Sequence, residues 1–188
     1  MVMNKTISRL LIVDSFIMTA FGLLGPIYAI FVEKIGGNIL DTGIAFAIYS
    51  ITLGVFSYFI GKLGDRIKKD YHLLCIGLVI TTAGFCGYLL VQNPMELMIV
   101  QFILGIGHAV YNPIFDSVFS AHLDTNKKSS EWADWESLNF IVTGVMSVLG
   151  AWLVFTFGFK TLFILMFLSS LFGLVLLKKL KRQIMKNV

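Results

Sequence analysis

The sequence predicts an all-α membrane protein, in which six transmembrane helices form one bundle and both termini are cytoplasmic. Three observations lead to this fold class. Of the 188 residues, 57% are hydrophobic and only 14% are charged, and the mean hydropathy of +0.84 lies outside the range of soluble domains. The apolar residues form six runs that are long enough to cross a bilayer. The basic residues gather at alternate connections between these runs.

The first run covers residues 10–32 and is too long for a signal peptide, so we expect a retained helix. Five of its residues share one face: Asp14, Met18, Phe21, Gly25 and Tyr28. Pro26 loosens the helix beside this face and frees carbonyl groups for a ligand or a neighbouring helix. A carboxylate within the membrane that alternates between wet and dry surroundings can take up and release a proton. Asp14 is therefore a candidate for the translocation path and for proton coupling.

The second and third runs cover residues 42–60 and 73–91. Tyr49 and Thr52 of the second run either line a path or pack against neighbours. Cys75 and Cys86 lie on one helix, where they cannot form a disulfide, and we expect both to be packing residues. Between these runs, residues 61–69 read GKLGDRIKK, a short segment so rich in charge that we expect a loop in water.

The fourth run, residues 95–121, carries a polar stripe. Its members are Gln101, Gly105, His108, Asn112 and Asp116. At 100° per residue their spacing places them within an arc of roughly 80°. Polar residues at this depth usually face a cavity or the bundle interior, so the stripe predicts a translocation path. The alternative is that these side chains only join neighbouring helices by hydrogen bonds. Because histidine changes its charge near neutral pH, His108 is the second candidate for proton coupling.

The fifth and sixth runs, residues 135–157 and 161–177, complete the bundle. Asn139, Thr143 and Ser147 recur every four residues along the fifth run, where they either line the path or pack. Trp132 precedes this run and Trp135 begins it, and we expect both side chains to anchor the helix among the lipid headgroups. The basic tail, residues 178–188, is predicted to stop transfer through the membrane, with contact to anionic headgroups as the alternative.

The positive charges predict the orientation. If the N-terminus is cytoplasmic, only Lys34 and Lys160 lie outside. The basic residues on the cytoplasmic side are then Lys5, Arg9, Lys62, Arg66, Lys68, Lys69, Lys127, Lys128, Lys178, Lys179, Lys181, Arg182 and Lys186. We therefore expect a multi-pass protein of the cell membrane with cytoplasmic termini. The net charge of +4 follows from this asymmetry, so nucleic acid is not an expected partner.

The segment GKLGDRIKK resembles the signature between the second and third helices of the major facilitator superfamily. The matching residues are Gly61, Gly64, Asp65, Arg66 and Lys69, whereas Lys68 stands where the family usually has glycine. A weaker match is QFILGIG, in which Gln101 replaces the arginine of a family motif. The resemblance implies that Asp65 belongs to a gating loop. It also implies an ion pair from Lys69 or Arg66 to Asp116. Asp116 therefore has two alternative roles, as a partner in this ion pair or as a member of the translocation path.

Transporters of this superfamily have two six-helix repeats with the substrate site between them, and this chain supplies one. A polar face turned toward lipid would be costly, so a partner is required, and a second copy is the simplest. We therefore expect a secondary active transporter of a small solute that works as a homodimer. Two alternatives stay open. The chain could be a non-transporting subunit that pairs with another six-helix protein, or a fragment of a longer gene.

Motifs for catalysis are scarce. The sequence has no HExxH zinc pattern, phosphate-binding loop or GxSxG elbow, so we expect neither an enzyme nor a metal or cofactor. Two aspartates within the membrane raise the alternative of an aspartyl protease, but GIGH at residues 105–108 lacks the aspartate of its GxGD signature. The weak charge and the abundant Phe and Tyr near the stripe favour an amphipathic or apolar solute over sugars and polyanions.

Overall fold

The computed structural model describes residues 5–67 and 69–181, and every regular element within these ranges is a helix. The helices are α1 (Lys5–Leu24), η1 (Gly25–Ile27), α2 (Tyr28–Lys34), α3 (Ile39–Ile67), α4 (Asp70–Gly87), α5 (Pro94–His122), α6 (Lys128–Phe157) and α7 (Phe159–Lys179). Since α1, η1 and α2 follow one another in a single span, the described chain has six helices long and apolar enough to cross a membrane. The predicted all-α class with six spans is confirmed.

The first span changes its helical type at Pro26. The ring of Pro26 lacks an N–H group, and residues Gly25–Ile27 form a turn of 3-10 helix instead of continuing α1. Tyr28 begins α2 directly after this turn. The change of helical type therefore lies at Gly25 and Tyr28, two residues of the face that the sequence predicted to be functional.

The segment 61–69 differs from the predicted loop because α3 continues through Ile67. A helix satisfies its backbone hydrogen bonds internally, so it can project past the apolar region while its charged side chains remain exposed. Gly64 is buried, and a Cβ atom at this position would lie 2.6 Å from Cδ1 of Ile114. This glycine thus permits a close approach to α5. Lys68 lies outside the described residues.

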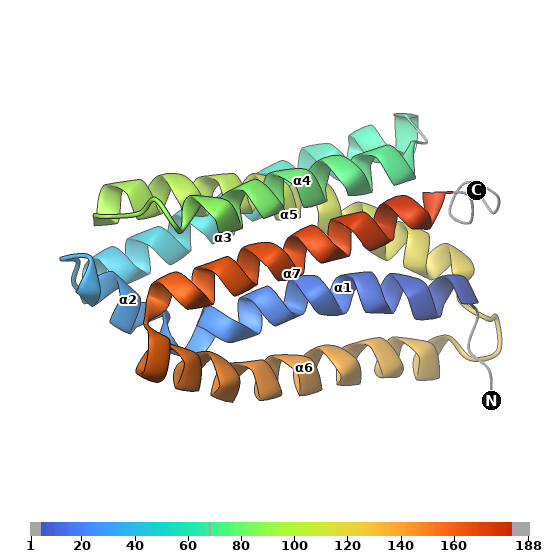
Figure 1. Cartoon of the computed structure of the whole chain (residues 1–188). Coiled ribbons are helices and arrows are strands. Elements are labelled where there is room, and N and C mark those ends of the chain that lie inside the picture. Colours follow the sequence, from blue (N-terminus) through green and yellow to red (C-terminus); the bar gives the residue numbers. More distant parts are fainter. Residues whose placement is uncertain (1–4, 68, 182–188) are drawn as a thin grey trace.

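The helices form two groups of three that lie side by side (Figure 1). One group contains α1, α6 and α7, and the other contains α3, α4 and α5. Contacts between α4 and α7 and between α1 and α5 join the groups. α1 begins and α7 ends at the same end of the bundle. Two apolar clusters fill the interior, one toward each end, around Phe115 and Phe119 and around Phe31 and Phe163.

Burial differs sharply among the helices. α5 runs through the interior and contributes fifteen buried residues, whereas α3 contributes three and α6 only two. Large apolar side chains such as Phe46 and Phe140 are exposed on these two helices. α3 and α6 therefore offer most of their surface to lipid or to a partner.

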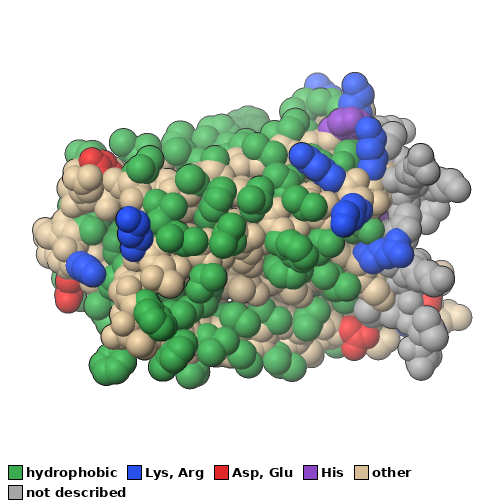
Figure 2. Space-filling model, in the orientation of Figure 1, with side chains coloured by type: hydrophobic (Ala, Val, Ile, Leu, Met, Phe, Trp, Pro, Cys, Tyr) green, Lys and Arg blue, Asp and Glu red, His purple; other side chains and the backbone are tan. Residues whose placement is uncertain are grey.

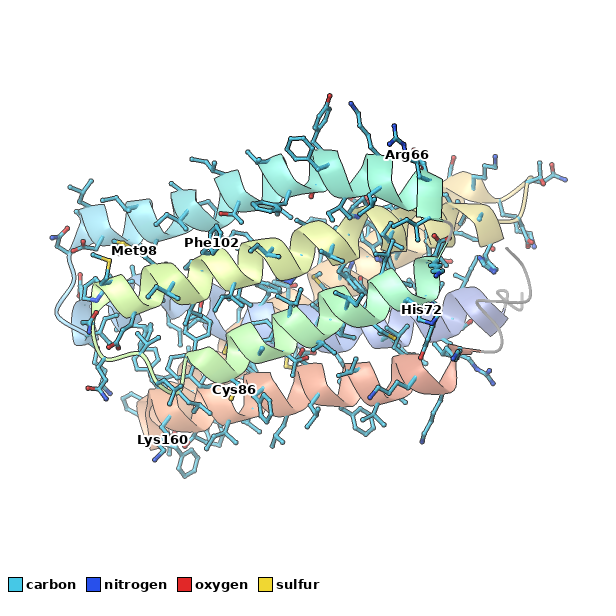
Figure 3. The ribbon with its side chains drawn as sticks, turned by 90° about the horizontal axis from the view of Figure 1, so that it is seen from above. Arg66, His72, Cys86, Met98, Phe102 and Lys160 are labelled. Atoms are coloured by element: carbon cyan, nitrogen blue, oxygen red, sulfur yellow. The ribbon has the colours of Figure 1, made fainter. Side chains whose placement is uncertain are left out.

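The basic side chains are distributed unevenly along the bundle. On the face drawn in Figure 2, hydrophobic side chains cover the middle, and most Lys and Arg side chains lie toward the end where α7 finishes. Arg66 and Lys160 lie at opposite ends (Figure 3). The distribution among the described residues agrees with the charge pattern of the sequence. Arg182 and Lys186 lie outside the described residues, as does the tail after Lys181.

Candidate functional site

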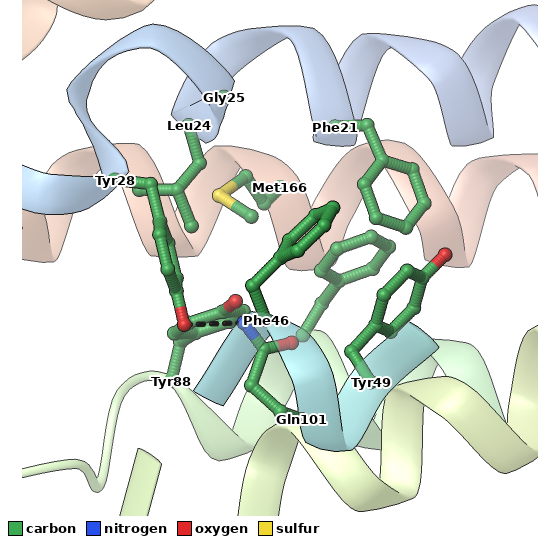
Figure 4. A pocket seen from close by; sticks show the side chains of 10 residues that line it. Phe21, Leu24, Gly25, Tyr28, Phe46, Tyr49, Tyr88, Gln101 and Met166 are labelled. Carbon is green, nitrogen blue, oxygen red and sulfur yellow. Dashed lines mark hydrogen bonds between the residues drawn. The ribbon is translucent and has the colours of Figure 1, made fainter. Parts of the chain in front are cut away.

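A cavity of about 190 Å³ opens beside the break in the first span (Figure 4). Six α-helices and the 3-10 turn contribute to its wall, and six of the ten lining residues are aromatic. The lining residues are Phe21, Leu24, Gly25, Tyr28, Phe46, Tyr49, Phe85, Tyr88, Gln101 and Met166. Such a cavity suits a ligand with a flat apolar body.

Gln101 brings the clearest polar group to this wall. Its side-chain amide donates a hydrogen bond of 2.5 Å to the hydroxyl of Tyr28, and the two side chains meet across the cavity (Figure 4). Gln101 is 6% exposed, so the amide depends on this partner. A ligand that pairs with both groups could replace this bond without leaving a buried polar atom unpaired.

Tyr49 and His108 form a second polar pair, in which Tyr49 lines the cavity and His108 does not. The Tyr49 hydroxyl lies 3.0 Å from Nδ1 of His108, while Nε2 of the same ring has no hydrogen-bond partner among the described residues. Phe21 packs on the imidazole with ring centroids 4.6 Å apart. Gly105 makes the pair possible, because a Cβ atom there would lie 2.9 Å from the Tyr49 carbonyl oxygen. Because glycine has no Cβ atom, α3 can approach α5 closely at this position.

Asp14 lies in a separate polar cluster between α1 and α6. The carboxylate is 2% exposed, and its Oδ2 atom accepts hydrogen bonds from Nε1 of Trp135 at 2.8 Å and from Nδ2 of Asn139 at 3.2 Å. No basic residue of the described chain lies within 4 Å of it. A buried carboxylate that is held only by neutral donors is sensitive to protonation, because the charged form has no counter-ion.

Glycine contacts fix α1 against α6 and so position this cluster. An added Cβ atom at Gly22 would lie 3.0 Å from Cα of Thr143, and one at Gly150 would overlap the carbonyl oxygen of Leu23. The Ser147 hydroxyl also donates to the Gly22 carbonyl at 3.3 Å. Thr143 therefore lies at the crossing of the two helices, away from the cavity.

The predicted stripe on α5 divides into two parts. Gln101, Gly105 and His108 are buried at or behind the cavity, whereas Asn112 is half-buried and Asp116 is exposed. Neither Asn112 nor Asp116 lines the cavity. The expected ion pair is not formed, since neither Lys69 nor Arg66 lies within 4 Å of Asp116 among the described atoms. Both cations are exposed.

The signature residues frame a second hollow, of about 390 Å³, at the end of α3. Gly61, Gly64 and Asp65 line it from α3, and Pro113, Ile114 and Ser117 line it from α5. Asp65 is exposed and belongs to no ion pair within the described chain. The carboxylate is therefore available to a group outside the six helices.

A sequence profile of the Major Facilitator Superfamily matches residues 10–186, nearly the whole chain. The chain belongs to the Major Facilitator Superfamily. Among curated members, the chain is similar to the "Multidrug resistance protein MdtG" of Enterobacter lignolyticus, with 23% identity over 175 residues. The protein of the same name from Klebsiella pneumoniae is 22% identical over 164 residues. These matches cover 91% and 85% of this chain but only 42% and 40% of the relatives.

Two solved structures of POT family transporters support the fold. The POT family transporter PepTSo superposes with a TM-score of 0.77 at 14% identity, over 97% of this chain and 38% of that one. An auto-inhibited POT family peptide transporter gives a TM-score of 0.75 at 12% identity, over 95% of this chain and 37% of that one. The six helices thus correspond in arrangement to less than half of each of these two transporters.

The sequence did not predict several residues of the site. Trp135 was expected at the lipid headgroups, but it also donates to Asp14 and packs near Phe119, with ring centroids 6.3 Å apart. The sequence offered no reason to expect four other lining residues, because nothing distinguishes them from the remaining apolar residues of the six helices. These are Phe46, Phe85, Tyr88 and Met166. For Trp135, the four-residue spacing to Asn139 was the available signal. The described residues contain no group of three or more His, Cys, Asp or Glu that could hold a metal ion.

Proposed function

We propose that this superfamily member is a secondary active transporter that moves a small amphipathic or apolar solute through the cavity of Figure 4. The observation that carries the proposal is the aromatic wall around the single Tyr28–Gln101 hydrogen bond. Aromatic faces bind flat apolar bodies with little directional demand, and one exchangeable polar pair adds selectivity. The name of the MdtG relatives, multidrug resistance proteins, agrees with such a solute class.

The second half of the transporter is proposed to be another copy of the chain. α3 packs against α5 and α6 packs against α1, and both helices leave most of their residues outside the bundle. The cavity and Asp65 both open at the surface. Superfamily halves are related by an axis along the membrane normal, which two copies of equal orientation reproduce. We place both termini in the cytoplasm and the protein in the cell membrane, in accord with the charge pattern.

Gating is assigned to Gly61, Gly64, Asp65, Arg66 and Lys69. Asp65 would face the positive end of a helix in the partner when the cytoplasmic side is closed. Asp14 and His108 are the groups proposed to couple transport to protons, with Asn139 holding Asp14. Asn112, Asp116 and Thr143 remain predicted members of the path, although they lie apart from the cavity.

Reconstitution tests the transport proposal. The purified chain, as the sole protein in proteoliposomes, is expected to accumulate a fluorescent aromatic amine under an imposed pH gradient. Tyr28→Phe should reduce the apparent affinity by about tenfold, since it removes one of the two polar groups of the cavity with which a solute would pair. Tyr71→Phe on α4, outside the cavity, is the matched control and should leave flux unchanged. A folded chain without flux would favour the non-transporting subunit.

Native mass spectrometry tests the dimer. The chain has a mass of 21.0 kDa, so the expected species in mild detergent contains two chains of this mass. A stable monomer that still transports, or an assembly with a different membrane protein, would contradict the homodimer.

A further inference from the structure

A hollow of about 290 Å³ lies between α1 and α7, at the end of the bundle where α1 begins and α7 ends. Its wall consists of two basic and three aliphatic residues: Arg9, Ile12, Leu176, Lys179 and Leu180. None of them contributes to the aromatic cavity or to the hollow beside Asp65. This hollow therefore has no part in the proposed transport path.

The two cations of the hollow lack an acidic partner. Arg9 and Lys179 are exposed, and neither lies within 4 Å of a described carboxylate. α7 has no acidic residue, and the one acidic residue of α1 is Asp14, which is buried and bonded to Trp135 and Asn139. The two helices thus bring uncompensated positive charge to one concave surface.

The helix dipole accounts for one of these cations and not for the other. Lys179 ends α7, where the partial negative charge of the last carbonyl groups favours a cation. Arg9 lies in the second turn of α1, near the positive end of that helix, so the dipole gives it no stabilisation. An anion in the hollow would be attracted by both side chains.

Two of the three aliphatic residues lie deeper along the same two helices, whereas Leu180 directly follows Lys179. Ile12 follows Arg9 by three residues and Leu176 precedes Lys179 by three, so each cation stands one turn nearer the bundle end than an aliphatic side chain. Ile12 is 50% exposed although it lies within a membrane-spanning helix. The hollow therefore combines a charged rim with an apolar wall that continues toward the middle of the bundle.

We propose that this hollow binds an anionic phospholipid, with the phosphate between Arg9 and Lys179 and an acyl chain against Ile12 and Leu176. The order of charge and apolar surface along the bundle matches the order of headgroup and chain in a lipid. A soluble phosphate would engage the rim alone and leave the aliphatic wall uncovered. Further exposed cations nearby, such as Lys178 and Lys181, raise the local positive potential.

Lipid titration of the delipidated full-length chain, followed by native mass spectrometry, tests the proposal. Phosphatidylglycerol should remain bound at concentrations at which phosphatidylcholine and free glycerol phosphate do not. The double variant Arg9→Gln/Lys179→Gln should weaken phosphatidylglycerol binding by about thirtyfold, since each basic residue near an anionic surface contributes about fivefold. Arg9→Lys/Lys179→Arg keeps both charges and should restore most of the binding.

The matched control is Lys62→Gln/Lys128→Gln, which removes the same charge from exposed sites outside the hollow. Phosphatidylglycerol binding should change less than twofold in this variant. An equal loss in both double variants would overturn the proposal, because net charge alone would then explain the binding. Binding of glycerol phosphate as tight as that of the lipid would also overturn it. Retention of the lipid by Arg9→Gln/Lys179→Gln would do the same.

Discussion

The Asp14 carboxylate is the residue whose surroundings differ most from those of an ordinary charged side chain. It is buried, has no counter-ion in the described chain, and is held by an indole and an amide from α6. Hydrogen bonds to a charged group stabilise more than bonds between neutral groups, particularly where water is absent. The bond to Trp135 should therefore contribute measurably to the stability of the bundle.

Replacement of the two neighbouring tryptophans separates hydrogen bonding from packing. Trp135→Phe removes the donor to Asp14 and should lower the free energy of unfolding in detergent by about 1.5–3 kcal/mol. Trp132→Phe is the control, since Trp132 contacts Phe119 and Trp135 through its ring, and it should cost about 1 kcal/mol. Equal losses in chemical denaturation would contradict a role for the bond to Asp14.

At this scale the sequence identified Asp14, Gln101 and His108, since polar groups are conspicuous in apolar runs. It did not identify their partners. Trp135 is 121 residues from Asp14 along the chain, and Tyr28 is 73 residues from Gln101. Such pairs depend on the packing of helices, which residue spacing within one helix does not determine.

Among the elements, α1 and α6 show how small residues set the distance between two helices. Gly22 and Gly150 leave no room for a Cβ atom, so the backbones approach closely and bring Asn139 and Trp135 to Asp14. The sequence contained both glycines, but it did not show which helices they bring together.

Two glycines of α6 provide a matched pair for testing this packing. Gly150→Ala places a methyl group against the Leu23 backbone, which should separate the helices and cost about 1–3 kcal/mol. Gly144→Ala meets no atom within 4 Å and should stabilise the helix by up to about 1 kcal/mol. Thermal unfolding in detergent should therefore shift in opposite directions. Shifts of the same sign and size would contradict the assigned crossing.

The end of α3 shows the limit of charge as a signal for loops. Charge and two glycines predicted a loop at residues 61–69, yet the helix continues to Ile67. High charge requires exposure to water, but it does not require an irregular backbone. The resemblance to the superfamily signature did not determine the conformation of this segment either.

For the whole molecule, hydropathy alone predicted six spans, because the length and apolarity of a membrane helix are local properties. The grouping into two sets of three helices and the low burial of α3 and α6 arise only from packing. The aromatic cavity adjoins one of these two helices, since Phe46 and Tyr49 of α3 line it.

The central claim is that solute crosses through the aromatic cavity, and a plugged cavity tests it most directly. Gly25 lines the cavity, and a Cβ atom there meets no atom within 4 Å, whereas Ala83 lies exposed on α4, a helix outside the proposed contact with the second copy. Gly25→Leu fills the cavity and should abolish solute flux in proteoliposomes, while Ala83→Leu should transport like the unmodified chain. Both variants should retain the two-chain mass. Undiminished flux in Gly25→Leu would contradict the claim.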